Sequence, residues 1–202
     1  MTMMPLSDPQ PDFELLRRVR AGDGEALSAL YRKHSTPLYR FALLHCGSAD
    51  TANDVVQETF LALLSDKGRF DPNQGSLGNY LFGVARNLSR RTLEMAHRWV
   101  ANDDGDDATP DTALQPAEKL LRDETIESVR AALLKVPAHF REVLILYEMH
   151  DFSYAEAAIA CGIDIGTVRS RLHRGRAVLA KLLTQAGLME RKTAPAQAGS
   201  EA

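Results

Sequence analysis

Apolar residues recur every three or four positions along most of this chain, a spacing typical of amphipathic α-helices rather than strands. The first such stretch begins near Phe13. A second runs from Ala26 to Leu44, continues through Pro37, and closes at Gly47. These two stretches predict two helices at the start of the chain.

The same spacing predicts four further helices before residue 150. A loop containing FDPNQGS lies between residues 68 and 78, and the Val136-Pro137 pair interrupts a later stretch. The four helices cover about Asp50 to Leu64, Leu77 to Leu88, Pro116 to Leu134 and Phe140 to Tyr147. The chain is therefore expected to be all-α.

The helical pattern stops at residues 101–115, ANDDGDDATPDTALQ, where Leu114 is the single large apolar residue. Residues 101–130 hold nine acidic side chains against three basic ones, whereas both flanking parts are slightly positive. An aspartate-rich stretch with proline and glycine is typical of a flexible linker. We therefore predict two small helical domains at 13–100 and 117–185, an acidic linker at 101–116 and a disordered tail at 186–202.

Composition narrows the class of protein. The 202 residues carry a net charge of −3, and the two cysteines have no CxxC spacing and follow no secretory signal, which predicts a reduced, cytoplasmic protein. The longest apolar runs are too short to cross a bilayer, so no membrane insertion is expected. The six histidines lack metal-ligand spacing, and His45 and Cys46 fit a helix end and core. No catalytic residue, metal or cofactor is assigned.

The segment from Ser153 to Arg176 carries the most specific local signals. Ser153 and Glu156 have the spacing of a capping box at the start of a helix. Gly162 follows a small apolar run where a left-handed helix cap is needed, and a second helical pattern starts a few residues later. Two short helices joined by a tight turn form a helix-turn-helix.

The second helix of this motif has a buried face and a basic face. Val168, Leu172 and Leu179 recur at spacings of four and seven residues, which places them inward. The outward positions are then Arg169, Ser170, His173 and Arg174, with Arg171 and Arg176 at the flanks. Arginine forks and a serine hydroxyl can bond base edges or phosphates in a DNA major groove. A solvated basic helix is the alternative, but the coincidence of cap, turn and inward residues favours DNA binding.

The helix at 50–64 has an acidic face opposite its apolar one. The apolar side holds Val56, Phe60, Leu63 and Leu64. The other side holds Asp50, Asp54, Gln57, Glu58 and Leu61. This face is either a solvated surface or a docking surface for a basic partner, with an apolar contact beside the charges.

The helix that begins near Leu77 has a basic side. Its polar positions are Arg86, Asn87, Arg90 and Arg91. Arginines near aromatic side chains can neutralise phosphates and stack with unpaired bases. The alternative places Tyr80 and Phe82 in the core and leaves the arginines as ordinary surface.

The order of these parts resembles the extracytoplasmic-function sigma factors of bacterial RNA polymerase, group 4 of the sigma-70 family. The segment DVVQETFLALL at 54–64 is similar to the polymerase-binding helix of that family. The segments REVLIL, HDFSYAEAA and GTVRSRLHRGR, between residues 136 and 176, are similar to its promoter-reading domain. The resemblance covers about Phe13 to Arg98 and Ala117 to Leu183.

The resemblance implies an initiation factor that docks on core RNA polymerase and makes no covalent change to a substrate. It implies contacts with the polymerase clamp coiled coil and flap, with promoter DNA, and with an anti-sigma regulator. The clamp would be bound by Asp50, Asp54, Gln57, Glu58 and Leu61. The minus-ten element would be bound by Tyr80, Arg86, Asn87, Arg90 and Arg91, with Asn87 lining the pocket of a flipped-out base. The minus-thirty-five element would be read by Thr167, Arg169, Ser170, Arg171, His173 and Arg174.

A stand-alone helix-turn-helix regulator is the alternative function. It would use the second domain alone and bind a palindrome as a dimer without polymerase. The acidic face at 50–61 and the basic side of the helix from Leu77 would then have no role, which favours the sigma-factor interpretation.

Overall fold

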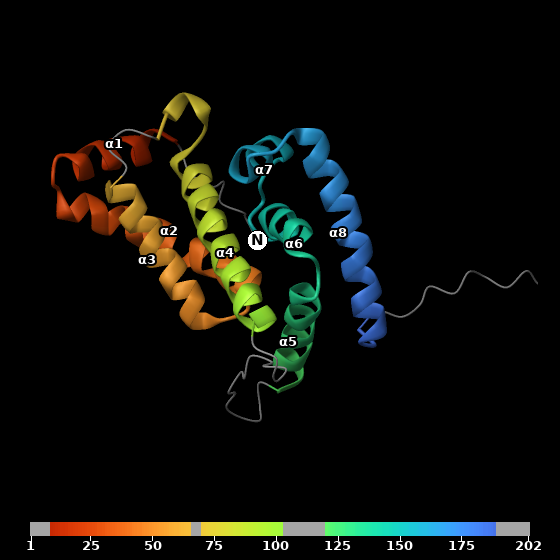
Figure 1. Ribbon diagram of the computed structural model, residues 1–202. Helices are drawn as coiled ribbons and strands as arrows, with labels where there is room; N and C mark the ends of the chain where they lie inside the picture. Colours follow the sequence, from red (N-terminus) through yellow and green to blue (C-terminus); the bar gives the residue numbers. More distant parts are fainter. Residues whose placement is uncertain (1–8, 66–69, 103–119, 189–202) are drawn as a thin grey trace, which may run out of the picture.

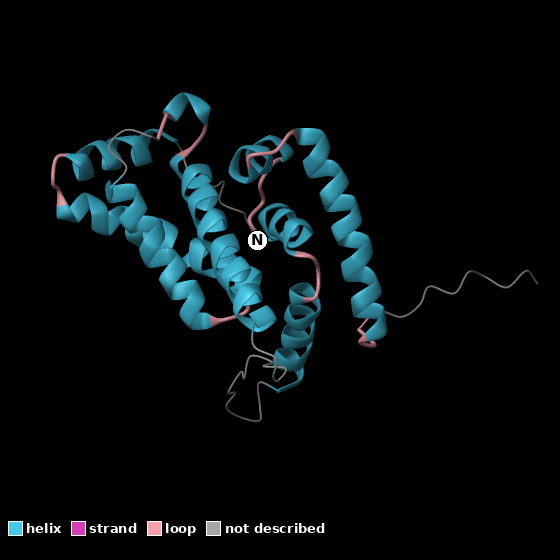
Figure 2. Ribbon diagram, in the orientation of Figure 1, coloured by secondary structure: helices cyan, strands magenta, loops and turns pink. Residues whose placement is uncertain are grey.

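The computed structural model describes residues 9–65, 70–102 and 120–188, and over these residues every regular element is helical (Figures 1 and 2). Eight α-helices, α1 to α8, make up this described part of the chain together with two short turns, η1 and η2. The all-α class predicted from the apolar spacing is confirmed. None of the described helices is long and apolar enough to span a membrane.

Helix α2 organises the N-terminal domain. This domain contains α1 (Pro9–Arg20), α2 (Gly24–Cys46), α3 (Ala49–Ser65), the 3-10 turn η1 (Pro72–Gln74) and α4 (Leu77–Asn102). Helix α2 packs against α1, α3 and α4, and it buries Leu30, Leu38 and Phe41 almost completely. The ring of Phe41 meets that of Phe82 in α4 edge-on, with 5.6 Å between centroids. The predicted passage of α2 through Pro37 is confirmed.

A buried carboxylate attaches α1 to this core. Asp12 accepts hydrogen bonds from Lys33 Nζ at 2.7 Å and pairs with His34 Nε2 at 3.1 Å. Burial opposes ionisation of Asp12, but the bonds and charges of His34 and Lys33 hold the pKa of its carboxyl below the ordinary value. Because a buried charge needs partners, this contact determines where α1 lies on α2.

The C-terminal domain is a smaller helical unit that contains the predicted helix-turn-helix. Its elements are α5 (Leu120–Leu134), α6 (Ala138–Leu144), the π-helical turn η2 (Ile145–Met149), α7 (Tyr154–Cys161) and α8 (Ile165–Gln185). The capping box of Ser153 and Glu156 is present, and Gly162 takes a left-handed φ of 62°. Both local predictions are confirmed. The side chain of Asp164 then caps α8 by accepting a hydrogen bond from the backbone N–H of Thr167 at 2.8 Å.

The two domains pack against each other, with α7 against α4 and α5 beside α2 (Figure 1). Buried apolar residues from both domains form one continuous cluster. Gly83 of α4 allows the close approach, because a Cβ atom there would lie 3.3 Å from the carbonyl oxygen of Ala160 in α7. Phe82 also meets Phe152 and His150 of the C-terminal domain, at 5.0 and 4.8 Å between ring centroids.

Several boundaries differ from those predicted from the spacing alone. Helix α1 begins at Pro9, and α4 continues to Asn102, two residues into the predicted linker. Leu64 is 45% exposed rather than buried, because it follows Leu61 by three positions and shares that residue's side of α3. The rest of the predicted linker and the predicted tail beyond Leu188 lie outside the described residues.

Replacing Ser153 by alanine should lower the free energy of unfolding by about 0.5–2 kcal/mol, because the backbone N–H of Glu156 loses its acceptor. Chemical denaturation followed by circular dichroism measures the change. Ser28→Ala is the matched control, since the Ser28 hydroxyl donates to the Gly24 carbonyl on an exposed helix surface and caps nothing. Equal stability of the Ser153 and Ser28 variants would contradict a stabilising role for the cap.

Candidate nucleic-acid interface

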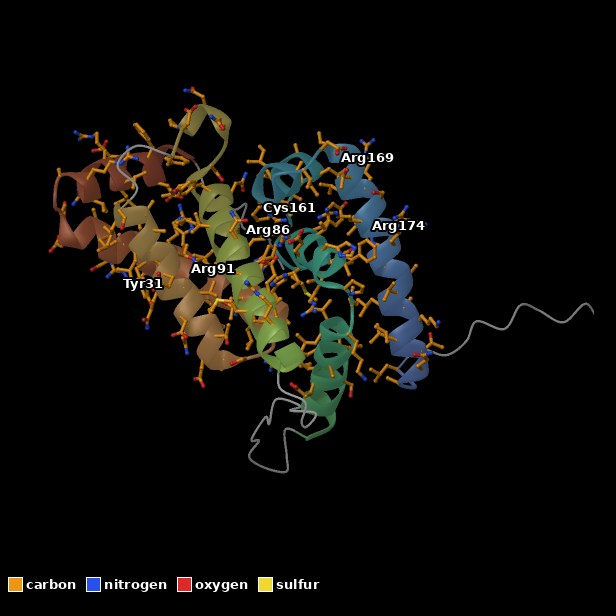
Figure 3. All side chains as sticks on the ribbon, viewed as in Figure 1. Tyr31, Arg86, Arg91, Cys161, Arg169 and Arg174 are labelled. Atoms are coloured by element: carbon orange, nitrogen blue, oxygen red, sulfur yellow. The ribbon has the colours of Figure 1, made fainter. Side chains whose placement is uncertain are left out.

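The outer side of α8 presents four polar side chains together. Arg169, Ser170, His173 and Arg174 are all exposed, whereas Val168 and Leu172 are buried beneath them. Arg169 and Arg174 project from the outer side of α8, away from the N-terminal domain (Figure 3). The inward and outward positions predicted from helical spacing are confirmed, although Leu179 is half-buried. We call these four exposed residues the reading face.

Two stacked tyrosines support one edge of the reading face. The rings of Tyr147 and Tyr154 lie 5.0 Å apart and nearly parallel, at 13°. The Arg169 guanidinium lies over Tyr154 at 5.5 Å, and that of Arg176 lies over Tyr147 at 5.4 Å. Cation–π contacts of this kind restrict where a guanidinium points. Neither tyrosine was predicted from the sequence to lie beside this face, because both precede α8 and nothing in their spacing relates them to it.

The other two predicted minus-thirty-five residues are engaged within the protein. Thr167 donates its hydroxyl proton to the Asp164 carboxylate at 2.5 Å, next to the α8 cap. Arg171 is half-buried on the side of α8 opposite Arg169 and donates to Glu142 at 3.0 Å. Both lie beside the reading face rather than on it.

The basic residues predicted on α4 divide between two environments. Arg86 is only 7% exposed, and it donates from Nε and Nη2 to Glu142 at 2.7 and 3.0 Å. Asn87, Arg90 and Arg91 are exposed. Arg91 lies on a different side of α4 from Arg86, as five residues of helix require (Figure 3). The sequence placed Arg86 on the polar surface, but in this structure it lies between the two domains.

A cleft of about 710 Å³ lies between α4 and α7. It is lined by residues of both domains, including Phe70, Tyr80, Asn87, Arg90, Cys161 and Arg171. The rings of Phe70 and Tyr80 meet at 5.6 Å between centroids on the α4 side. Burial, followed by the charge of Glu142, raises the pKa of the Cys161 thiol to about 12. That thiol is therefore protonated and unreactive at neutral pH.

The acidic face predicted on α3 is fully presented to solvent. Asp50, Asp54, Gln57 and Glu58 are exposed, and Leu61 is 53% exposed. Beside this face lies a shallow apolar groove of about 590 Å³, formed chiefly by Leu27, Tyr31, Phe60, Leu61 and Leu64. Tyr31 comes from α2 and packs on Phe60 at 4.9 Å between ring centroids. Tyr31 was not predicted from the sequence to lie here, since it belongs to a different helix from the acidic face.

The described residues hold no cluster of histidine, cysteine and carboxylate side chains suited to a metal ion. His45 lies in the core at the end of α2, as predicted, and burial lowers its pKa to about 3. Burial likewise lowers the pKa of His150 to about 4. Both rings are therefore neutral at physiological pH.

Two family models match the chain in the order of its domains. Residues 30–99 match Sigma-70 region 2, and residues 126–179 match Sigma-70 region 4. The chain is 40% identical over 146 residues to the ECF RNA polymerase sigma factor EcfG of Rhodopseudomonas palustris, covering 72% of this chain and 78% of the relative. It is 30% identical over 174 residues to SigM, an ECF RNA polymerase sigma factor of Mycobacterium tuberculosis, covering 85% and 84%.

A solved structure shares the arrangement of helices. The sigma factor RpoE from Bartonella quintana, crystallised in complex with the anti-sigma factor NepR, superposes with a TM-score of 0.65 at 30% identity. The match covers 78% of this chain and 96% of that one. Together, the helix-turn-helix, the order of the two regions and these similarities show that the chain belongs to the ECF RNA polymerase sigma factors.

Proposed function

We propose that this protein docks on core RNA polymerase through the acidic face of α3 and directs transcription initiation at promoters that carry two recognised elements. One observation carries the proposal: a single chain presents an unpaired acidic face on α3 and, on other helices, two sets of arginine side chains. Among the described residues, Asp54 and Glu58 make no ion pair within the protein, so their charges remain available for a basic partner. A regulator that needs only its helix-turn-helix would have no use for that face.

The reading face of α8 is assigned to the minus-thirty-five element. Its arginine, serine and histidine side chains are the donors and acceptors that read base edges in a major groove. Thr167 and Arg171, at its sides, are assigned to the same element as supporting contacts with the DNA backbone.

The exposed side of α4 and the cleft beside it are assigned to the minus-ten element. Asn87 lines this cleft with Tyr80 and Arg90, so an extruded base can meet an amide, a ring and a cation together. Arg86 and Arg91 are assigned to the strand backbone on either side. Arg86 must leave its buried position to take up that role.

Residues 13–100 and 117–185 act as two promoter-binding domains, and the acidic linker at 101–116 lets polymerase determine their separation. The factor changes no covalent bond, needs no cofactor, and works in the cytoplasm, where polymerase and chromosome lie. A regulator of the anti-sigma class is included because the related RpoE binds NepR.

Replacing Asp54 and Glu58 together by lysine should abolish co-purification with core RNA polymerase, because the acidic face becomes basic. The fold should persist, since both side chains are exposed. Glu14→Lys with Glu25→Lys makes the same change in charge elsewhere in the N-terminal domain and should retain binding. Undiminished binding by the Asp54 and Glu58 variant would contradict the docking assignment.

Replacing Arg174 by alanine should cost about 1–3 kcal/mol of binding at one base position of the promoter, if the guanidinium bonds a base edge. Footprinting of the holoenzyme on a panel of single-base promoter variants measures the position dependence. Lys181→Ala removes a positive charge from the exposed C-terminal part of α8 and should not change base preference. A uniform loss across the panel would identify Arg174 as a phosphate contact instead.

Replacing Asn87 by alanine should impair promoter opening more than minus-thirty-five binding. An extruded base costs a few kcal/mol of stacking and pairing, and the amide supplies part of the compensation. Permanganate reactivity reports opening, and gel-shift titration of the closed complex reports binding. Asn53→Ala, on exposed α3 surface, is the control. Equal defects in both steps would count against a flipped-base pocket.

A further inference from the structure

The carboxylate of Glu142 is the most enclosed charge at the boundary between the domains. Its side chain is 0% exposed, and it belongs to α6 of the C-terminal domain. Arg86 of α4 donates two hydrogen bonds to this carboxylate, from Nε to Oε2 at 2.7 Å and from Nη2 to Oε1 at 3.0 Å. Arg171 of α8 donates to the same Oε1 at 3.0 Å. One carboxylate therefore holds an arginine from each domain.

This geometry is the one that an arginine offers to a phosphate. A guanidinium fork binds a carboxylate or a phosphate through the same pair of parallel donors. Although burial disfavours its charge, the bond to Glu142 raises the pKa of Arg86, so the guanidinium stays charged in this position. While Glu142 occupies the fork, no phosphate can use it.

Two further hydrogen bonds join the domains. We call the arrangement in which α7 packs on α4 the closed state. Arg141 donates to the carbonyl of His45 at 2.5 Å, and Arg130 donates to the carbonyl of Gly47 at 3.0 Å. These two bonds connect the C-terminal domain to the end of α2. Both acceptors are neutral backbone carbonyls, however, and none of the four residues is assigned to DNA binding. Glu142 is the contact that links closure to Arg86.

We propose that Glu142 is an internal substitute for promoter phosphate, which keeps the free protein closed and withholds Arg86 from the minus-ten strand. The role of Arg86 in this inference rests on the proposed function, whereas the closure of the two domains by Glu142 is independent of it. DNA and Glu142 compete for one guanidinium, so opening the domains and binding the melted strand are coupled.

In the closed state, the protein surfaces assigned to the two promoter elements differ in their exposure to solvent. The cleft that contains Asn87 is covered on one side by α7, and Arg86 is buried in it. The reading face of α8 and the acidic face of α3 remain exposed. The closed protein can therefore meet polymerase and the minus-thirty-five element before it can hold a melted strand.

Replacing Glu142 by glutamine removes the charge and keeps the shape, which leaves the buried Arg86 and the half-buried Arg171 without a counter-charge. The free full-length variant should open, with a larger radius of gyration and maximum dimension by small-angle X-ray scattering than the wild type. Glu148→Gln is the matched control, because Glu148 pairs at 2.7 Å with Arg176 of its own domain and, among the described residues, forms no hydrogen bond or ion pair with the other domain. It should scatter like the wild type.

A second variant opens the domains without changing any charge. In Gly83→Leu, the new side chain would meet Ala160 of α7, since the three heavy atoms nearest to an added Cβ belong to that residue. The added side chain therefore presses first on the C-terminal domain, across the boundary. This variant tests closure even if Glu142→Gln fails to fold.

The binding consequence is measured with fluorescent oligothymidylate, a probe of phosphate contacts without base specificity. Fluorescence anisotropy should show binding about tenfold tighter in Glu142→Gln than in wild type, comparable to one charge-assisted hydrogen bond regained. Gly83→Leu should also bind more tightly, and Glu148→Gln should match the wild type.

Expansion of both boundary variants together with tighter oligothymidylate binding would support the proposal. Wild-type scattering from both would overturn it, as would expansion without any gain in oligothymidylate affinity. A failure of the proposed function would look different: the wild-type chain would not bind core RNA polymerase, whereas the scattering of the variants would still report opening.

Discussion

A carboxylate removed from water must be neutralised, and the arrangement of this protein depends on how that requirement is met for Glu142. Its partners come from α4 and α8, so its burial requires that the two domains meet. An apolar contact also joins the two domains, since the rings of Phe82 in α4 and Phe152 of the C-terminal domain meet edge-on. Without Glu142, the same approach would bring two guanidinium groups together with nothing between them. One anion thus links the two helical domains.

The closed body leaves some surfaces free and engages others, and the difference has a physical basis. Side chains on the outer sides of α3 and α8 are far from the boundary and stay solvated, which preserves their charge for a partner. Residues on the inner side of α4 face α7 and are drawn into internal pairs. The acidic surface of α3 also disfavours contact with DNA, because both carry negative charge.

Helix ends and helix faces were predictable because their causes lie within a few residues. Ser153 and Glu156 are three positions apart, and the left-handed cap at Gly162 follows directly from the lack of a side chain. Spacing along α8 separated buried Val168 from exposed Arg169 in the same way. The spacing misplaced Leu64, because this residue shares the exposed side of α3 with Leu61, whereas its neighbour Leu63 is buried.

Sequence by itself determined that the chain is helical, that it ends in a helix-turn-helix with an outward basic face, and that α3 carries an acidic one. Those features arise from neighbours in one helix. Only the tertiary structure decided that Arg86 is buried and that Tyr154 supports Arg169. Arg86 and Glu142 are 56 positions apart, and no periodicity relates residues at that separation. Their pairing exists because two domains pack together, which is a property of the whole fold.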